Sequence, residues 1–315
     1  MKWFGFTLVL WGCAGTASVT PPVAPTQATV ASTLCGELNH PLVRLVNAGQ
    51  EPRARLQYRF AAPSTQRVVV EEDEQSTAHL EGRADPMTSR VHLREVIRLD
   101  ILRVLPDDSA EIEYTFEEFT LLNADTASEE ERSDFELSRA RSTGAHGTVR
   151  VSASGLATDV VPFIPAGTNE RDTESFHARA HQVQQIWLAM PDDPVGAGAY
   201  WEVCDPYRVA RKTINHVWKF TLSAIAGGSA RLNVRTETHE PDPWDFIQNV
   251  TVSNLVYEAE GDADFRLNDF DLDEHFNVRH SSHVMLSGPH GERAEMVQSS
   301  VNALRVSTSP AAATP

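Results

Sequence analysis

The sequence predicts an α+β protein built on one large, curved, mainly antiparallel β-sheet with two helices packed on it. Three observations lead to this class. Apolar and polar residues alternate with a period of two through most of the chain, turn residues separate the alternating runs, and only two segments show helical spacing. An open half-barrel is the specific form considered for this sheet, and residues 37–306 are expected to form a single β-rich domain.

The clearest pair of strands lies early in the domain. In 91–101 most apolar side chains share one face and charged side chains share the other, with Val96 as the exception. A turn is predicted at 106–109, and Ile112, Tyr114 and Phe116 then alternate with glutamates. One apolar and one charged face per strand indicate a sheet that is solvated on one side.

The same alternation returns in the second half of the chain. Residues 216–225 place aromatic and aliphatic side chains on one face, Gly227-Gly228 predicts a tight turn, and 230–234 continues that face. Further strands are predicted at 53–60, 66–82, 148–153, 156–161, 249–260, 263–271, 276–287 and 293–306.

Two segments are predicted to be helical. Residues 128–142 begin with a serine followed by three glutamates, which favours a capped first turn. Residues 172–190 carry an apolar stripe at helical spacing, and Pro191 is expected to end this helix. We expect the stripe to pack on the sheet, and a lid over a hydrophobic groove is the functional alternative.

The first thirteen residues resemble a bacterial lipoprotein signal. Lys2 precedes a short apolar run, and the run ends in Leu10-Trp11-Gly12-Cys13. Residues 1–12 would then be the signal peptide, 13–36 the lipidated Cys13 with a flexible linker, and 307–315 a disordered tail. Two alternatives remain: an ordinary secretory signal cleaved after Ala17, and a buried helix.

This signal predicts a location and a partner. Lipid on Cys13 would tether the protein to a membrane on the outer side of the cytoplasm. Ala14, rather than an acidic residue, follows the cysteine, so the expected location is the outer membrane of the cell envelope, facing the periplasm or the surface. The net charge of −17 and the pI near 5.1 argue against a nucleic-acid partner.

The cysteines predict one disulfide bond. With Cys13 lipidated, Cys35 and Cys204 remain, and two cysteines in an oxidising compartment most simply pair. Inert thiols and a catalytic Cys204 are the alternatives, the latter because His216 is close in sequence.

One short element carries a family resemblance. Residues 190–203 contain a Pro-x-x-Pro-Val-Gly-x-Gly-Ala-x-Trp pattern, formed by Pro191, Pro194, Val195, Gly196, Gly198, Ala199 and Trp201. The pattern resembles an uncharacterised family of bacterial lipoproteins, a domain of unknown function, and that resemblance supplies no catalytic residue. The residues themselves predict a conformational joint, because the prolines restrict the chain and the glycines permit close approach. The third glycine, the lysine and the helix of a phosphate-binding loop are missing.

The search for reactive groups gives no catalytic residue, metal site or cofactor. Four histidines cluster at 275–290 behind an acidic run, but His280 and His283 lie three residues apart on a predicted strand and would point to opposite faces. The acidic run also lacks the glycine and the terminal glutamate of a calcium loop.

Three hypotheses about function remain. The first is a non-enzymatic carrier that binds a lipid, another hydrophobic ligand or a protein partner on its apolar face, with Trp187, Trp201, Trp218, Phe220 and Leu222 as candidate lining residues. The second is a structural lipoprotein without a ligand, and the third is an enzyme with an unrecognised site. A pocket that gathers a histidine and a carboxylate with shifted pKa values would favour the enzyme, whereas an apolar groove without them would favour binding.

Overall fold

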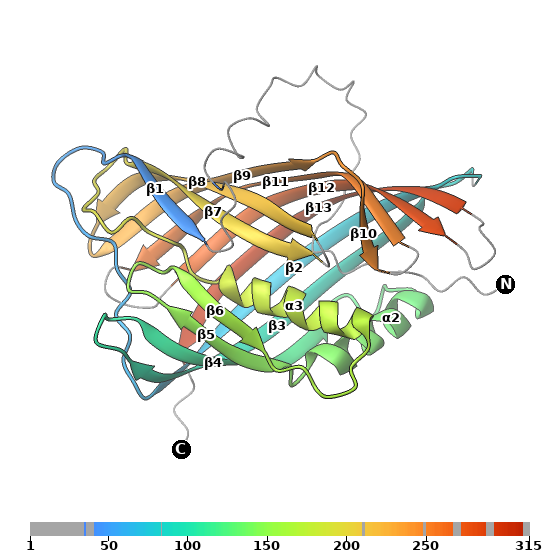
Figure 1. The fold of residues 1–315 in the computed structure, drawn as a ribbon, viewed down its shortest axis with the longest axis horizontal. Helices are drawn as coiled ribbons and strands as arrows, with labels where there is room; N and C mark the ends of the chain where they lie inside the picture. Colours follow the sequence, from blue (N-terminus) through green and yellow to red (C-terminus); the bar gives the residue numbers. More distant parts are fainter. Residues whose placement is uncertain are drawn as a thin grey trace.

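The computed structural model describes residues 35, 41–82, 84–209, 212–247, 250–266, 272–287 and 293–310. Cys13, the predicted signal peptide and most of the predicted linker lie outside these residues. Within them the chain forms thirteen strands and two helices, and all thirteen strands belong to one antiparallel sheet (Figure 1). The strands of the first half are β1 (Leu42–Asn47), β2 (Ser64–Leu80), β3 (Met87–Val104), β4 (Ala110–Leu121), β5 (His146–Val151) and β6 (Ala157–Pro162). Those of the second half are β7 (Tyr200–Val209), β8 (Lys212–Ala226), β9 (Ser229–Glu240), β10 (Trp244–Ile247), β11 (Val250–Arg266), β12 (Leu272–Ser287) and β13 (Arg293–Pro310).

The sheet consists of two meanders joined through the last strand. Its order is β1-β7-β8-β9-β11-β12-β13-β2-β3-β4-β5-β6, with β10 paired to β11 beside this path. The final strand, β13, therefore pairs with β2 near the start of the domain, and the two edge strands β1 and β6 do not pair with each other. The prediction of a large antiparallel sheet with two helices is confirmed, and the sheet is open and curved (Figure 1).

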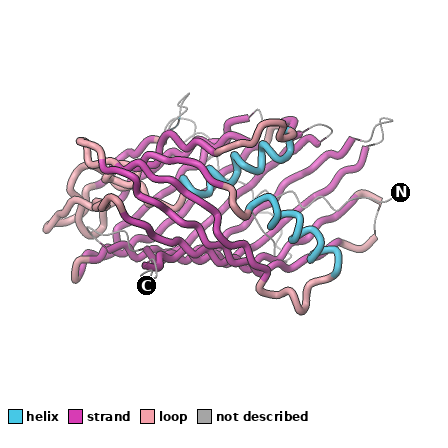
Figure 2. The backbone as a smooth tube through the Cα atoms, turned by 90° about the horizontal axis from the view of Figure 1, so that it is seen from below, coloured by secondary structure: helices cyan, strands magenta, loops and turns pink. Residues whose placement is uncertain are grey.

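Both helices lie against this sheet. The first, α2 (Glu129–Ser142), begins with a capping box in which Ser128 and Glu131 satisfy each other's backbone N–H groups. The second, α3 (Glu170–Gln184), is capped by Asn169 and contacts β6 and β7. Because β6 is one edge of the sheet and β7 lies next to the other, α3 sits where the open sheet would otherwise leave a gap (Figures 1 and 2).

The core lies on the concave side of the sheet. Alternate residues of nearly every long strand face inward, and the largest fully buried side chains include Trp201, Tyr114, Phe116 and Phe265. The outward faces carry paired charges instead, such as Arg98 with Asp100. No helix among the described residues is both long and apolar enough to cross a bilayer.

Several predicted boundaries were wrong, for identifiable reasons. Residues 53–60 form no strand: they cross the sheet as an extended segment that buries Leu56 and Tyr58, and this packing produces the same alternation as a strand. The helix predicted at 172–190 ends at Gln184, and the rest of its apolar stripe continues as non-helical chain.

The break predicted between 260 and 263 is also absent, because β11 runs through it. A Cβ atom on Gly261 would lie 1.9 Å from the carbonyl oxygen of His275, so this glycine permits close backbone approach and makes no turn.

The predicted disordered tail begins inside β13, where Ser307 still pairs with Val69 of β2. The pairing of β3 with β4 shifts register between Val96 and Ile97, where Glu117 of β4 is the extra residue.

Candidate functional site

A short covering segment, residues 184–190, begins at the last residue of α3 and lies over the concave face. Three hydrogen bonds fix it to the domain: Leu188 N–H donates to the Tyr58 hydroxyl at 3.0 Å, Trp201 Nε1 donates to the Ala189 carbonyl at 2.9 Å, and Met190 N–H donates to the Ser154 carbonyl at 2.7 Å. The covering segment is therefore held from two sides of the sheet, and it is a fixed part of the fold.

A buried ion pair anchors the helix that leads into the covering segment. Arg179 of α3 and Glu95 of β3 are 2.6 Å apart, and their side chains are 6% and 2% exposed. Gln182 donates to the same carboxylate at 2.5 Å, and Arg179 also donates to the hydroxyl of Ser142 at the end of α2. The guanidinium lies over the Phe119 ring, 4.9 Å from its centroid. This network fixes the position of α3 on the sheet.

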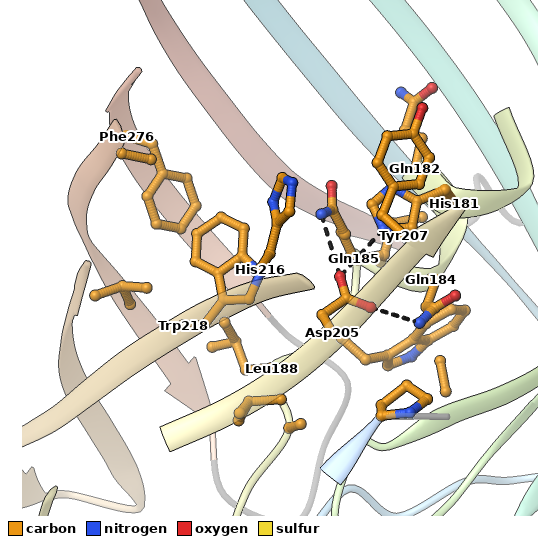
Figure 3. Close-up of a pocket in the computed structure, with 18 of the residues that line it drawn as sticks. His181, Gln182, Gln184, Gln185, Leu188, Asp205, Tyr207, His216, Trp218 and Phe276 are labelled. Carbon is orange, nitrogen blue, oxygen red and sulfur yellow. Dashed lines mark hydrogen bonds and ion pairs between the residues drawn. The ribbon is translucent and has the colours of Figure 1, made fainter. Parts of the chain in front are cut away.

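A cavity of about 180 Å³ lies between the covering segment and the concave face. Its wall is mainly apolar and comes from strands on both sides of β11: it includes Val203, Trp218, Phe220, Val234, Phe276 and Val278. Figure 3 shows Trp218 and Phe276 side by side at one part of this wall. The cavity thus offers apolar surface to a ligand inside the core.

The strand register places hydrogen-bonding side chains in a line across the concave face, next to the cavity. We call this line the polar row. From β7 to β3 it consists of Asp205, His216, Thr238, Tyr257, His280, Ser300, Ser76 and Ser89. Four of its members, Asp205, His216, Tyr257 and His280, line the cavity itself.

Asp205 is the most strongly hydrogen-bonded member of the polar row. Its carboxylate accepts from Gln184 Nε2 at 2.8 Å, from His181 Nε2 at 3.1 Å and from Gln185 Nε2 at 3.4 Å (Figure 3). Burial alone would raise the pKa of Asp205, but His181, followed by His216 and the Gln185 hydrogen bond, holds this pKa below its ordinary value. Asp205 is therefore a buried carboxylate that stays ionised, and α3 supplies two of its three partners.

Two aromatic rings and a second histidine surround this carboxylate. The His181 ring stacks on Tyr207 at 3.9 Å between centroids, and the His216 ring lies 5.0 Å from Tyr257. Burial, reinforced by the charge of His181, lowers the pKa of His216 to about 4, so its imidazole is neutral at neutral pH. Burial likewise raises the pKa of Tyr207, which remains a phenol.

A second carboxyl group lies at the far side of the cavity. Glu274 is 2% exposed, and its Oε1 atom has no hydrogen-bond partner in the described part of the chain. Burial, followed by repulsion from Asp273, raises the pKa of Glu274 well above its ordinary value, which favours the neutral acid. Glu274 and His280 are six residues apart on β12, so about 20 Å of strand separates this acid from the polar row.

The structure divides the five residues predicted to face a hydrophobic ligand. Trp187, Trp218 and Phe220 line the cavity. Trp201 and Leu222 are fully buried and belong to the closed core, where the Trp201 ring stacks on Phe220 at 5.5 Å. The position along β8 distinguishes Phe220 from Leu222. Leu222 lies two residues beyond Phe220 and pairs with Leu232, away from the cavity.

The glycine element at 190–203 forms a crossing with the segment before β2. Ala54 and Val195 exchange two backbone hydrogen bonds of 2.9 Å, and Gln50 N–H donates to the Ala197 carbonyl at 2.9 Å. A Cβ atom on Gly196 would lie 1.7 Å from the Gln50 carbonyl oxygen, and Gly198 has a φ of +77°. These contacts agree with the expected conformational joint between helix and sheet.

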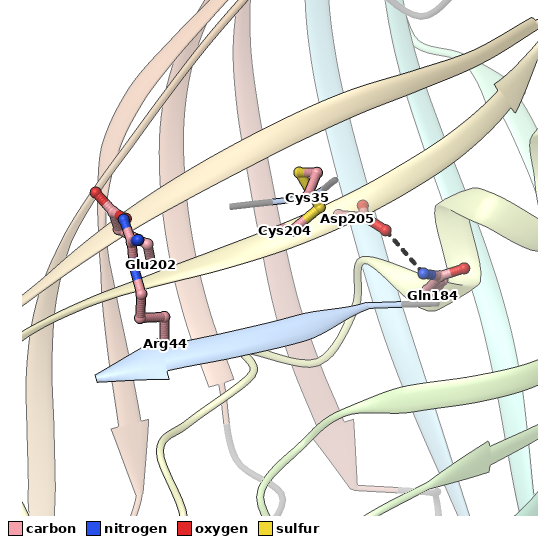
Figure 4. The surroundings of a disulfide bond; sticks show 6 residues. All are labelled: Cys35, Arg44, Gln184, Glu202, Cys204 and Asp205. Carbon is pink, nitrogen blue, oxygen red and sulfur yellow. Dashed lines mark hydrogen bonds and ion pairs between the residues drawn. A yellow bond between two sulfur atoms is a disulfide. The ribbon is translucent and has the colours of Figure 1, made fainter. Parts of the chain in front are cut away.

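The predicted disulfide between Cys35 and Cys204 is present, with Cα atoms 5.4 Å apart. Both cysteines are fully buried and pack with Val217, whereas Asp205, the next residue of β7, turns to the other face and reaches Gln184 (Figure 4). The disulfide therefore holds β7 from the face of the sheet opposite Asp205, the charged member of the polar row. Cys204 has no free thiol, so the alternative of a catalytic cysteine is excluded.

Sequence reasoning missed most of the polar groups of the site. Glu95 lies between Leu93 and Ile97 on the apolar face of its predicted strand. A charged residue is rarely buried unless an opposite charge pairs with it, so this position indicates a buried ion-pair partner. His216 was considered only as a base for Cys204. His280 and His283 do face opposite sides, since His280 is buried and His283 lies 3.3 Å from Glu295 on the outer face.

Comparison with known proteins adds no assignment. No protein-family model matches the chain, and no curated protein matches it in sequence. The resemblance of the 190–203 element to a lipoprotein family stays a prediction, and the site must be interpreted from its own chemistry.

Proposed function

We propose that this protein is a non-enzymatic, membrane-anchored envelope lipoprotein that binds the apolar part of a lipid or another hydrophobic molecule on the concave face of its sheet. One observation carries the proposal: a mainly apolar cavity of about 180 Å³ lies under the covering segment. An apolar cavity of ~150 Å³ is enough to admit benzene. Binding sites for whole drug-sized molecules are ~300–1,000 Å³, so we expect a chain or ring to enter while the rest of the ligand stays outside.

The proposed location is supported by the disulfide. The Cys35–Cys204 bond is of the kind that persists in oxidising compartments and is rare in the cytosol. Lipidation at Cys13, which lies outside the described residues, would place such a domain at the outer membrane. A half-barrel resembling the envelope lipoprotein carriers is the fold analogy that accompanies this proposal, and it carries no function by itself.

Native mass spectrometry tests the proposal. Residues 14–315, which contain every described residue, would be exported to an oxidising periplasm, purified and titrated with the uncharged fluorescent probe N-phenyl-1-naphthylamine. We expect a co-purifying adduct of lipid mass, or saturable probe binding, that Trp218→Asp abolishes because the change puts a charge in the cavity wall. Phe163→Asp is the matched control, because Phe163 is 56% exposed and lies away from the cavity.

The outcomes separate the alternatives. Loss of binding in Trp218→Asp, with an unchanged circular dichroism spectrum and normal binding in Phe163→Asp, supports the proposal. A clean apo mass together with no probe binding refutes it and favours a structural lipoprotein or a protein partner.

An enzyme is the second candidate, because the cavity also gathers a histidine and a carboxylate with shifted pKa values, which favours catalysis. Asp205 and His216 have shifted pKa values in the same pocket, and such shifts gather at catalytic sites. Within the described part of the chain, however, no hydroxyl or thiol is hydrogen-bonded to His181 or His216 to serve as a nucleophile. Recovery of an ester ligand intact after incubation supports the binding protein, whereas cleavage that His216→Asn abolishes would establish the enzyme.

A further inference from the structure

The concave face changes character along its strands. Phe220, Val234 and Phe276 occupy one transverse line through the cavity, and the polar row crosses the same strands four residues further along. The line between them is mixed, with Thr236 directly opposite both Trp218 and Ala259. An elongated molecule lying along the strands would therefore meet apolar side chains at one end and hydrogen-bonding side chains at the other.

Four hydroxyl groups at or next to this polar end have no hydrogen-bond partner within the described chain, whereas those of Ser76 and Ser89 bond each other. Thr236, Thr238, Ser282 and Ser300 are each at most 4% exposed, and all four side-chain oxygens lack a hydrogen-bond partner. The Nδ1 atom of His216 is unsatisfied in the same way. Buried polar atoms are nearly always paired, because an unpaired one costs ~1–3 kcal/mol. These unpaired groups lie on β8 and β9 and, beyond β11, on β12 and β13, and so many of them indicate a polar ligand group that completes them.

These groups border the cavity on the same face. Thr238 lies opposite Tyr257, and Ser300 lies opposite His280; Tyr257 and His280 both line the cavity. Ser282 follows two residues after His280 and faces the same side of β12. A head group attached to a chain in the cavity would therefore lie within reach of the hydroxyls.

The charges of the site disfavour an anionic head group, because His181, the basic group beside Asp205 in the cavity wall, already pairs with that carboxylate. No lysine or arginine is among the described residues that line the cavity. Lys212, at the end of β8, is already 2.6 Å from Glu240 and lies over the Trp244 ring. Asp205 would repel an anion, and burying an anion without a counter-charge is costly.

A cationic head group is also disfavoured, because the carboxylate that would attract it is occupied. Asp205 already accepts three hydrogen bonds, from His181, Gln184 and Gln185. What remains open on the polar row is neutral: hydroxyls, which both donate and accept, and one imidazole nitrogen.

We propose that the polar row and its bordering hydroxyls bind the uncharged, hydroxyl-bearing head group of an amphiphile, such as an acylglycerol or a glycolipid, whose chain occupies the cavity. This inference deepens the proposed function and rests on it. Ser and Thr hydroxyls suit such a head because each can match either the donor or the acceptor of a ligand hydroxyl.

The test compares head groups on one constant chain. Residues 14–315 are titrated by calorimetry at pH 7.5 with monododecanoylglycerol, dodecanoate and dodecyltrimethylammonium, each below its critical micelle concentration, and with glycerol alone. We expect monododecanoylglycerol to bind about tenfold more tightly than either charged amphiphile, a ratio that corresponds to ~1.4 kcal/mol. Glycerol alone should show no binding at the same concentrations, because the chain supplies the apolar contact.

Two variants assign the preference to the named hydroxyls. Ser300→Ala and Thr238→Val each remove one unpaired hydroxyl and should lower the affinity for monododecanoylglycerol severalfold while leaving that for dodecanoate unchanged. Ser299→Ala and Thr221→Val are the matched controls, because both residues are exposed: Ser299 precedes Ser300 on β13, and Thr221 lies on β8. The wild-type head-group series needs no variant, so it decides the question even if a substitution perturbs folding.

Each outcome has one meaning. Equal affinities for all three amphiphiles would refute the head-group inference and leave hydrophobic binding intact, and a preference for the anion or the cation would refute it as well. Binding of none of them would refute the proposed function itself. Free glycerol binding as tightly as its acyl ester would show a polyol site that is independent of the lipid, which also contradicts the inference.

Discussion

Replacing Arg179 by methionine should strongly destabilise the domain, because it leaves the carboxylate of Glu95 buried without its counter-charge. Glu95 is 2% exposed, and only Gln182 would still donate to it. Removing one partner of a buried ion pair costs ~3–5 kcal/mol. Methionine retains part of the contact with Phe116 and Phe119, so most of this loss is electrostatic. Urea denaturation followed by circular dichroism measures the free energy of unfolding of each variant.

A double-mutant cycle with a surface control isolates this electrostatic term. Glu95→Gln in the Arg179→Met background should recover most of the loss, because the buried group is then neutral. Arg139→Met removes an arginine of α2 whose pair with Glu136 is more than half exposed, and it should cost under ~0.5 kcal/mol. An Arg179→Met variant within ~1 kcal/mol of wild type, or a double mutant no better than the single one, would refute this interpretation of the network.

Two further predictions concern other buried groups. Glu274→Gln should stabilise the protein increasingly as the pH rises above 4.5, the ordinary pKa of a glutamate in the unfolded chain, because the folded-state pKa of Glu274 is raised. Between these two pKa values the unfolded wild type binds fewer protons than the folded one. The wild type therefore loses up to ~1.4 kcal/mol of stability per pH unit until the folded-state pKa is reached. Urea denaturation between pH 5 and 8 checks this, with the exposed Glu237→Gln as control, and parallel wild-type and Glu274→Gln curves would contradict it. Reducing the Cys35–Cys204 bond, or replacing both cysteines by alanine, should lower the free energy of unfolding by ~2–5 kcal/mol, because the bridge closes a loop across a sequence separation of 169. A denaturation midpoint that does not respond to reductant would show that the bond does not restrain the unfolded chain.

Local patterns predicted much of the fold correctly. Alternation in 91–101 and 112–116 placed β3 and β4 and assigned Ile97, Leu99 and Ile112 to the buried face. Such assignments succeed because side chains of a strand point to alternate sides whatever its neighbours are. Capping chemistry did the same for α2, whose start depends on the few residues from Ser128 to Glu131.

Patterns shared by different structures led to errors. Residues 53–60 alternate because Leu56 and Tyr58 are buried, and an extended crossing segment buries alternate residues just as a strand does. Separate strands were predicted at 249–260 and 263–271, and Gly261 lies between them; a glycine that makes a turn and one that admits a neighbouring backbone look alike in a sequence. The apolar stripe of 172–190 continued past the end of α3 because the covering segment packs on the same core.

The sequence by itself predicted most of the long strands with their buried faces, the two helices and the preferred pairing of Cys35 with Cys204, because each depends on local periodicity or on elimination among few residues. It predicted neither β1 nor β10. Only the tertiary structure decided the site. Asp205, His216, Thr238, His280 and Ser300 are up to 95 residues apart and come together because the register of each strand pair adds to the next across the sheet. A shift of one residue in any pair would turn a member to the opposite face. No local sequence pattern fixes the registers of all these strand pairs together, so the polar row can be recognised only in the folded sheet.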